Sequence, residues 1–283
     1  MQFVETFVPT AREVGLLPIL TEQFLNIALF SFAGAFVFFL ASRNSLAPWH
    51  RASGTLTAVI CLVAGASYWF IRTYYHDLLH ALATVPPADV PRRRQLIHDG
   101  FFAIGGYRYM DWAVTTPLLL LKMVLTLKVK PREIMGTIAV LLGADFLMVV
   151  AGAIGDQQFN ADGSVRVGAH LLWGTISTGF YLVIPYGLFY RLWPRFGGHG
   201  DDSSGRAFRL MALSTVTTWG VYPLGYLVPA LWPGADLNWV HLAFTVADVV
   251  NKVGVGVVAY LAGAQELEER VPRESVQKAW LVS

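Results

Sequence analysis

The sequence is poor in the residues that stabilise small secreted domains or that hold metal ions. Its 283 residues include a single cysteine, Cys61, which excludes a disulfide framework within the chain. Charged residues make up only 14% of the chain and the formal net charge is +2, so the sequence gives no argument for a nucleic-acid partner. Internal repeats and low-complexity segments are also lacking, and no metal site is predicted.

Hydrophobic residues, in contrast, make up 55% of the chain, and the mean hydropathy is +0.50. These values are outside the usual range of soluble proteins and favour a lipid bilayer as the surrounding solvent. A helix needs about 20 apolar residues to cross a bilayer. Seven runs approach or exceed that length, at 23–42, 53–75, 108–127, 133–155, 168–193, 207–231 and 239–263.

The predicted fold is therefore an all-α membrane protein, a seven-transmembrane-helix bundle over residues 23–263. Residues 1–22 lack the pattern of a cleaved signal peptide and are expected to form an extracellular cap segment or a frayed end. Residues 264–283 are expected to form a polar cytoplasmic tail. The polar stretch 76–100, between the second and third spans, is expected to be a long loop folded over the outer mouth.

The Lys and Arg residues outside the spans predict the orientation, because cytoplasmic loops carry an excess of them. An external N-terminus and a cytoplasmic C-terminus leave only six on the outer side: Arg12, Arg72, Arg92, Arg93, Arg94 and Arg166. The same orientation puts twelve on the inner side: Arg43, Arg51, Lys128, Lys130, Arg132, Arg191, Arg195, Arg206, Arg209, Arg270, Arg273 and Lys278.

Ionisable residues inside a span are costly and call for a partner or a function. In the seventh span, Asp248 and Lys252 are four residues apart and share one helix face. One interpretation is a structural ion pair. The other is that Lys252 forms an imine with an aldehyde, because an apolar site disfavours the ammonium form and leaves a nucleophilic amine. Asp248 would then neutralise the protonated imine.

The third span carries a second polar face. Arg108, Asp111 and Thr115 are three and four residues apart, which aligns them along the helix. Thr115 and Thr116 precede Pro117, which removes a backbone hydrogen bond from the helix. An alternative role for the two threonines is therefore structural, since Thr hydroxyls can satisfy the backbone groups that a proline leaves unpaired within a membrane. Aromatic residues form a further stripe in the sixth span, where Trp219, Tyr222, Pro223 and Tyr226 follow helical spacing. Such a stripe is either core packing or, with Trp112 and Trp173, the wall of a pocket for a flat apolar ligand.

These motifs together resemble the microbial rhodopsin family. The third-helix signature is Arg108, Tyr109, Asp111, Trp112, Thr115, Thr116 and Pro117; the sixth-helix motif is Trp219, Tyr222 and Pro223; and Asp248 with Lys252 matches the seventh helix. The resemblance implies all-trans retinal bound as a Schiff base to Lys252. It implies a pocket formed by Trp112, Thr116, Met148, Gly152, Trp173, Gly174, Ser177, Thr178, Trp219, Tyr222, Pro223 and Tyr226.

The resemblance also assigns roles to the charged residues. Asp111 would be the primary proton acceptor, Asp248 the second counter-ion and Arg108 an outward gate. Asp145 would be a buried structural partner of Thr116. Lys122, eleven residues after Asp111, stands where many pumps have the cytoplasmic proton donor; the alternative is that its long side chain reaches the inner interface.

The third helix also separates the subfamilies. Chloride pumps have a neutral residue at the position of Asp111, and sodium pumps of the family have Asn and Asp at the positions of Asp111 and Thr115. The sequence therefore resembles a proton pump near the sodium-pumping branch, with Ser67 where many proton pumps have a histidine. A photosensor with a signalling partner, a pump for another ion such as sodium, and a seven-span transporter or receptor that binds no retinal remain alternatives.

The resemblance extends to a second chromophore and to assembly. Gly174 follows Trp173 where bacteriorhodopsin has a bulky residue, and in xanthorhodopsin-like relatives such a gap admits a carotenoid antenna. The alternative is a glycine that serves only close helix packing. A homo-oligomer, trimer or pentamer, in a bacterial inner membrane is expected from the same resemblance.

Overall fold

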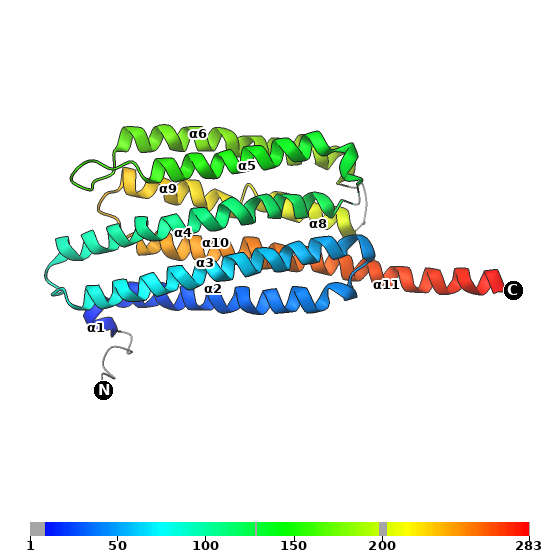
Figure 1. Ribbon diagram of the computed structural model, residues 1–283, viewed down its shortest axis with the longest axis horizontal. Helices are drawn as coiled ribbons and strands as arrows, with labels where there is room; N and C mark the ends of the chain where they lie inside the picture. The colour runs from blue at the N-terminus through cyan, green and yellow to red at the C-terminus, as the bar shows by residue number, and fades with distance from the viewer. Residues whose placement is uncertain (1–8, 128, 198–202, 283) are drawn as a thin grey trace.

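The regular elements in the computed structural model are helices, which group into seven rods within the described residues 9–127, 129–197 and 203–282 (Figure 1). The first four rods are α2 (Leu16–Ala41), which follows the short α1 (Ala11–Val14), then α3 (Arg51–Ala83), α4 (Val90–Leu125) and α5 (Met135–Asp156). Short 3-10 turns η2 (Ser42–Ser45), η3 (Pro48–His50) and η4 (Pro131–Glu133) lie in the connections.

The other three rods are interrupted helices. The fifth rod joins α6 (Val167–Tyr186), the π-helical η5 (Gly187–Leu192) and α7 (Trp193–Phe196). The sixth joins α8 (Ser203–Ser214), the 3-10 turn η6 (Thr218–Gly220) and α9 (Val221–Leu231). The seventh joins α10 (Asn238–Val249), the π-helical η7 (Val250–Gly254) and α11 (Val255–Val282). The predicted seven-helix membrane bundle is thus confirmed.

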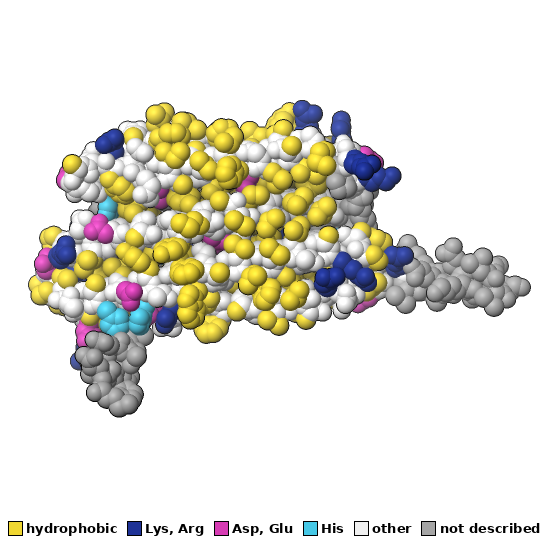
Figure 2. Space-filling view, in the orientation of Figure 1, with side chains coloured by type: hydrophobic (Ala, Val, Ile, Leu, Met, Phe, Trp, Pro, Cys, Tyr) yellow, Lys and Arg dark blue, Asp and Glu magenta, His cyan; other side chains and the backbone are white. Residues whose placement is uncertain are grey.

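In the part of the chain that the structure describes, five segments are long and apolar enough to cross a membrane by length and composition: Leu16–Ser45, Pro48–Ala83, Met135–Asp156, Val167–Phe196 and Asn238–Arg270. The third rod is less apolar because it carries Arg108, Asp111 and Lys122, and the sixth is divided between α8 and α9. Apolar side chains cover much of the visible surface between the two ends of the bundle, as Figure 2 shows. That surface is the one a bilayer would cover.

The expectation of a long outer loop at 76–100 is wrong. Helices α3 and α4 continue through most of this stretch, and only residues 84–89 separate them. Asp89 begins α4 by accepting a hydrogen bond from the Arg92 backbone nitrogen at 3.1 Å. With 33 residues, α3 is about 50 Å long, well beyond the ~30 Å hydrocarbon core, so polar residues at its outer end remain helical in water.

The two predicted end segments also contain helix. Helix α2 begins at Leu16, inside the proposed cap 1–22, after Gly15 separates it from α1 with a φ of 99° that favours glycine. Residues 1–8 lie outside the described part of the chain. Helix α11 continues through the proposed tail 264–283 as far as Val282.

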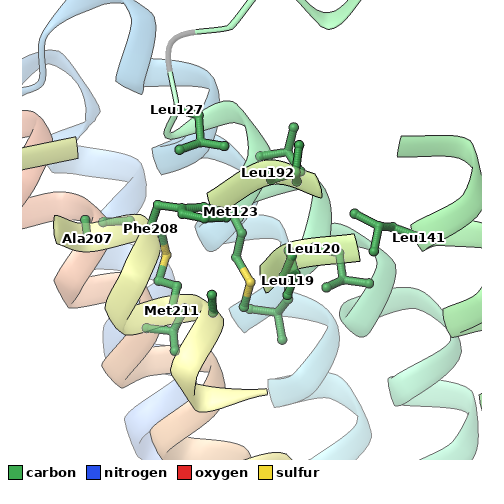
Figure 3. Close-up of a cluster of buried hydrophobic side chains, with 14 of the residues drawn as sticks. Leu119, Leu120, Met123, Leu127, Leu141, Leu192, Ala207, Phe208 and Met211 are labelled. Atoms are coloured by element: carbon green, nitrogen blue, oxygen red, sulfur yellow. The ribbon is translucent and has the colours of Figure 1, made fainter. Parts of the chain in front are cut away.

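The inner end of the bundle has an apolar core. Side chains from α4, α5, η5 and α8 converge there, and Figure 3 shows Leu119, Leu120, Met123, Leu127, Leu141, Leu192, Ala207, Phe208 and Met211 in this cluster. The cluster separates the middle of the bundle from the end at which α11 projects (Figure 1).

The sixth and seventh rods depart from regular α-helix near the middle of the bundle. Pro223 has no N–H for the carbonyl of Trp219, and the sixth rod is irregular from Thr215 to Gly220. The π-helical segment Val250–Gly254 contains Lys252, and π-bulges of this kind are frequent at functional sites.

Candidate functional site

Lys252 lies at the centre of a buried cluster of charges. Its Nζ is 2.5 Å from Asp111 Oδ2 and 3.2 Å from Asp248 Oδ1. The three side chains are at most 2% exposed. Arg108, also 2% exposed, contacts Asp248 at 3.4 Å, so two positive and two negative groups balance one another. Such balance is what allows charges to persist inside a membrane protein.

Asp248 is the acceptor of a dense hydrogen-bond network. The Tyr68 hydroxyl donates to its Oδ2 at 2.7 Å, while Trp112 Nε1 and the Tyr222 hydroxyl donate to its Oδ1 at 3.1 and 2.8 Å. Arg108 donates to the Tyr68 oxygen at 3.0 Å. These fixed donors stabilise the ionised carboxylate. Among the described residues, Asp111 Oδ2 accepts a hydrogen bond from Lys252, and Asp111 Oδ1 has no partner.

The two threonines of the third rod occupy different environments. Thr115 Oγ1 donates a hydrogen bond to the Asp111 carbonyl oxygen at 2.9 Å. Its hydroxyl thus satisfies a backbone group of the same helix, as the structural alternative predicted. Thr116 Oγ1 lies 2.7 Å from the Trp112 carbonyl and 2.8 Å from Asp145 Oδ2. The Thr116–Asp145 contact thus joins α4 to α5.

An elongated pocket adjoins this cluster. Eleven of the predicted cofactor-binding residues line it: Trp112, Thr116, Met148, Gly152, Gly174, Ser177, Thr178, Trp219, Tyr222, Pro223 and Tyr226. Trp173 is not among its lining residues and lies instead against Gly155. Lys252 stands at the adjacent charged cluster. The aromatic stripe of the sixth rod is thus a pocket wall rather than core packing alone.

The residues of the pocket are compatible in chemistry with a flat apolar aldehyde such as retinal. Two glycines of the pocket let aromatic side chains pack directly against the helix backbone. A Cβ on Gly152 would lie 3.2 Å from Tyr109, and a Cβ on Gly174 would lie 2.5 Å from Tyr226. The reactive group is a primary amine, and carboxylates surround it. Converting the Lys252 ammonium into a protonated Schiff base preserves its positive charge, so the balance with Asp111 and Asp248 is unchanged.

A family model described as "Bacteriorhodopsin-like protein" matches residues 20–265. The chain belongs to the bacteriorhodopsin-like family. Among curated members, the chain is 33% identical to bacteriorhodopsin of Halobacterium salinarum over 59% of its length, and 36% identical to archaerhodopsin-2 of Halobacterium sp. over 59%. The matched segments span only 60% and 61% of those relatives, respectively.

Solved structures of bacteriorhodopsin-like proteins match over more of their length. Exiguobacterium sibiricum rhodopsin is similar with a TM-score of 0.72 at 28% identity, covering 88% of this chain and 97% of that one. Xanthorhodopsin, described as a light-driven ion pump with dual chromophore, also has a TM-score of 0.72, at 27% identity, covering 90% and 96%. These comparisons confirm the family that the motifs predicted.

Sequence reasoning missed several residues of the site, of which three matter most for its chemistry or shape. Tyr68 bridges Arg108 and Asp248, while Asp156 and Phe244 line the pocket. Asp156 was detectable, because it is an acidic residue at the end of an apolar run. Tyr68 and Phe244 were not, since an aromatic residue in an apolar span gives no sign of which neighbour it faces.

Lys122 lies apart from the charged cluster. It is fully buried on α4, and its Nζ has no hydrogen-bond partner among the described residues. Its neighbours in sequence, Leu119, Leu120 and Met123, belong to the apolar core of the inner end. The interpretation in which this side chain reaches the interface does not fit an amine with no exposed surface.

Proposed function

We propose that this protein is a light-driven outward proton pump that carries all-trans retinal on Lys252. The observation that supports this function most directly is the 2.5 Å contact between Lys252 Nζ and Asp111 Oδ2. A carboxylate at this distance can accept a proton directly from the nitrogen. Light absorption and the change of shape that follows are the chemistry that retinal supplies.

In this proposal, the charged residues around Lys252 Nζ have different roles. Besides Lys252, four donors hold Asp248 as an anion, so it is a poor acceptor and serves as a permanent counter-ion. Asp111 has fewer donors and is the group that takes the proton. Arg108 lies next to Asp248 toward the outer end, and its charge controls whether a proton can pass outward.

Lys122 supplies the returning proton from the cytoplasmic side in this proposal. It lies about 16 Å from Asp111 along α4, at 1.5 Å per residue. Eleven residues also return to nearly the same helix face, so both side chains face the interior. Burial disfavours the ammonium form, and a neutral amine can take a proton from the cytoplasm and pass it on.

Light-induced pH change in a suspension of unbuffered cells tests the function. The medium should acidify under illumination, and a protonophore should abolish the change. A sodium pump would instead require sodium and give alkalinisation that a protonophore enhances. A photosensor, or a protein that binds no retinal, would give no pH change, and the latter would also lack a visible absorption band.

A carotenoid antenna is a second proposal, which rests on the wall beside Gly174. Thr178, on α6, lines the pocket and is also exposed at the surface of the bundle, so the pocket wall is thin there. Added hydroxylated carotenoid should transfer excitation energy to retinal. Gly174→Trp should remove the transfer. Because a side chain at this position displaces Tyr226, the visible band must be measured in the same sample to show that the variant still binds retinal. Absence of transfer for every carotenoid tested would leave Gly174 as a packing residue for Tyr226.

The pump would operate in a bacterial inner membrane, in contact with the lipid bilayer, and as a homo-oligomer. Its broad apolar surface is compatible with both lipid and like subunits. The mass of the complex in lipid nanodiscs should distinguish a trimer or pentamer from a monomer.

A further inference from the structure

One face of the seventh rod carries a row of buried polar side chains. Asn238, His241, Thr245, Asp248 and Lys252 are separated alternately by three and four residues, which places them along one face of the helix. Each is at most 2% exposed. The row therefore runs from the charged cluster to the outer end of α10 without passing through solvent.

His241 is the exceptional member of this row. Neither of its ring nitrogens has a hydrogen-bond partner among the described residues. Its nearest rings are aromatic, with Phe101 at 5.0 Å and Tyr75 at 5.7 Å between centroids. By comparison, both ring nitrogens of the buried His170 lie within 3.0 Å of backbone carbonyl oxygens. A buried polar group without a partner destabilises the fold, so this position calls for a function.

His241 is connected inward to the charged cluster. The Thr245 hydroxyl, one turn away, donates to the His241 carbonyl at 2.7 Å and accepts a hydrogen bond from Arg108 Nη2 at 3.2 Å. Arg108 in turn contacts Asp248. His241 is thus the next titratable side chain of the row on the outer side of Arg108.

His241 is also connected outward. Tyr75, whose ring packs on His241, donates through its hydroxyl to Asn238 Oδ1 at 2.5 Å. Asn238 Nδ2 donates to Asp236 Oδ1 at 2.8 Å, and Asp236 is exposed. The imidazole is therefore about one helix turn from a group in contact with external water.

We propose that His241 relays the outgoing proton between Arg108 and the outer surface. Neutral His241 accepts on a free ring nitrogen the proton that leaves Asp111, releases it to water at Asp236 and returns to the neutral form. One proton enters and one leaves in each cycle. The inference rests on the proposed function, since it adds an exit group to the pump.

The charges around His241 favour outward release. The Arg108 guanidinium, on the inner side, repels an imidazolium, whereas the Asp236 carboxylate attracts the proton toward water. The other groups facing this region are the Tyr75 hydroxyl from α3 and Glu22 from α2, which lies near Tyr75. Phe101 from α4 contributes no charge. An imidazolium on His241 is therefore short-lived and discharges outward.

The test is time-resolved proton release from the full-chain pigment in lipid vesicles, followed with pyranine after a laser flash. His241→Phe keeps an aromatic ring between Phe101 and Tyr75 but cannot carry a proton. We expect release to slow by about 100-fold, the lower end of the range for a lost acid-base group, with the visible band unchanged. His98→Phe is the matched control, because His98 also packs on aromatic rings at the outer end but lies off the row.

A second measurement does not depend on a variant that folds. Infrared difference spectra of wild-type pigment containing 15N-histidine should show a transient imidazolium signal during release. Absence of that signal, or wild-type release rates from pH 5 to 9 in His241→Phe, would overturn the relay. If wild-type pigment itself releases no proton, the failure lies with the proposed pump function. His241→Gln replaces the phenylalanine variant if that pigment does not form.

Discussion

The outer and inner halves of this bundle differ in the side chains that fill their interiors. Outward from Lys252, polar side chains such as Arg108, Thr245 and Asn238 are linked by hydrogen bonds and approach the surface. Inward, apolar side chains from several helices fill the interior (Figure 3). The Lys122 amine is buried there without a hydrogen-bond partner among the described residues. The difference teaches that polar groups already extend from the charged cluster toward the outer end, whereas the inner half holds few groups that could carry a proton without water entering an apolar region.

Lys252 joins the two halves, and removing its amine has the largest expected effect. Lys252→Ala should eliminate the visible absorption band completely, because no covalent link to retinal can form. Absorption spectra of membranes supplied with retinal measure this. Lys122→Ala is the matched control, since it removes the other buried lysine and should retain the band. A covalent pigment in Lys252→Ala would rule out this attachment site.

Neutralising Asp111 tests the first group of the outer half. Asp111→Asn should shift absorption to longer wavelength, because the positive nitrogen loses a counter-ion, and should reduce pumping by at least about 100-fold. Illuminated cell suspensions measure the pumping. Acidification at the wild-type rate in this variant would mean that another group accepts the proton.

Lys122→Ala tests the inner half. The pigment should return to its resting absorption about 100-fold more slowly, the lower end of the range for a lost acid-base group, because alanine cannot carry a proton. The recovery should become more dependent on external pH, and azide, a small proton carrier, should restore its rate. Flash photolysis measures both. Recovery equal to that of the wild type at every pH would leave Lys122 without a role in transport.

Asp145 lies between the two halves and has the smallest expected effect. Asp145→Asn retains a hydrogen-bonding group beside Thr116, so stability should change by less than about 1 kcal/mol. Pumping should stay within twofold of the wild type. Thermal bleaching of the visible band measures the stability. A variant that forms normal pigment but does not pump would show that Asp145 takes part in transport.

The sequence predicted the class of fold and much of the pocket. Hydropathy identified the seven spans, and helical spacing placed Asp248 beside Lys252, as the structure has them. It misjudged the segment 76–100, because hydropathy marks the residues that enter lipid and says nothing of where a helix ends in water. It also placed Trp173 in the pocket wall, although that residue lies against Gly155.

Spacing along the sequence determined which side chains share a helix face, because 3.6 residues per turn is a local property of the backbone. Only the tertiary structure decided which faces meet. The approach of Asp111 to Lys252, the bridge of Tyr68 between Arg108 and Asp248, and the seclusion of His241 depend on how the helices rotate against one another. That rotation is set by side-chain packing between distant segments, which no local periodicity specifies.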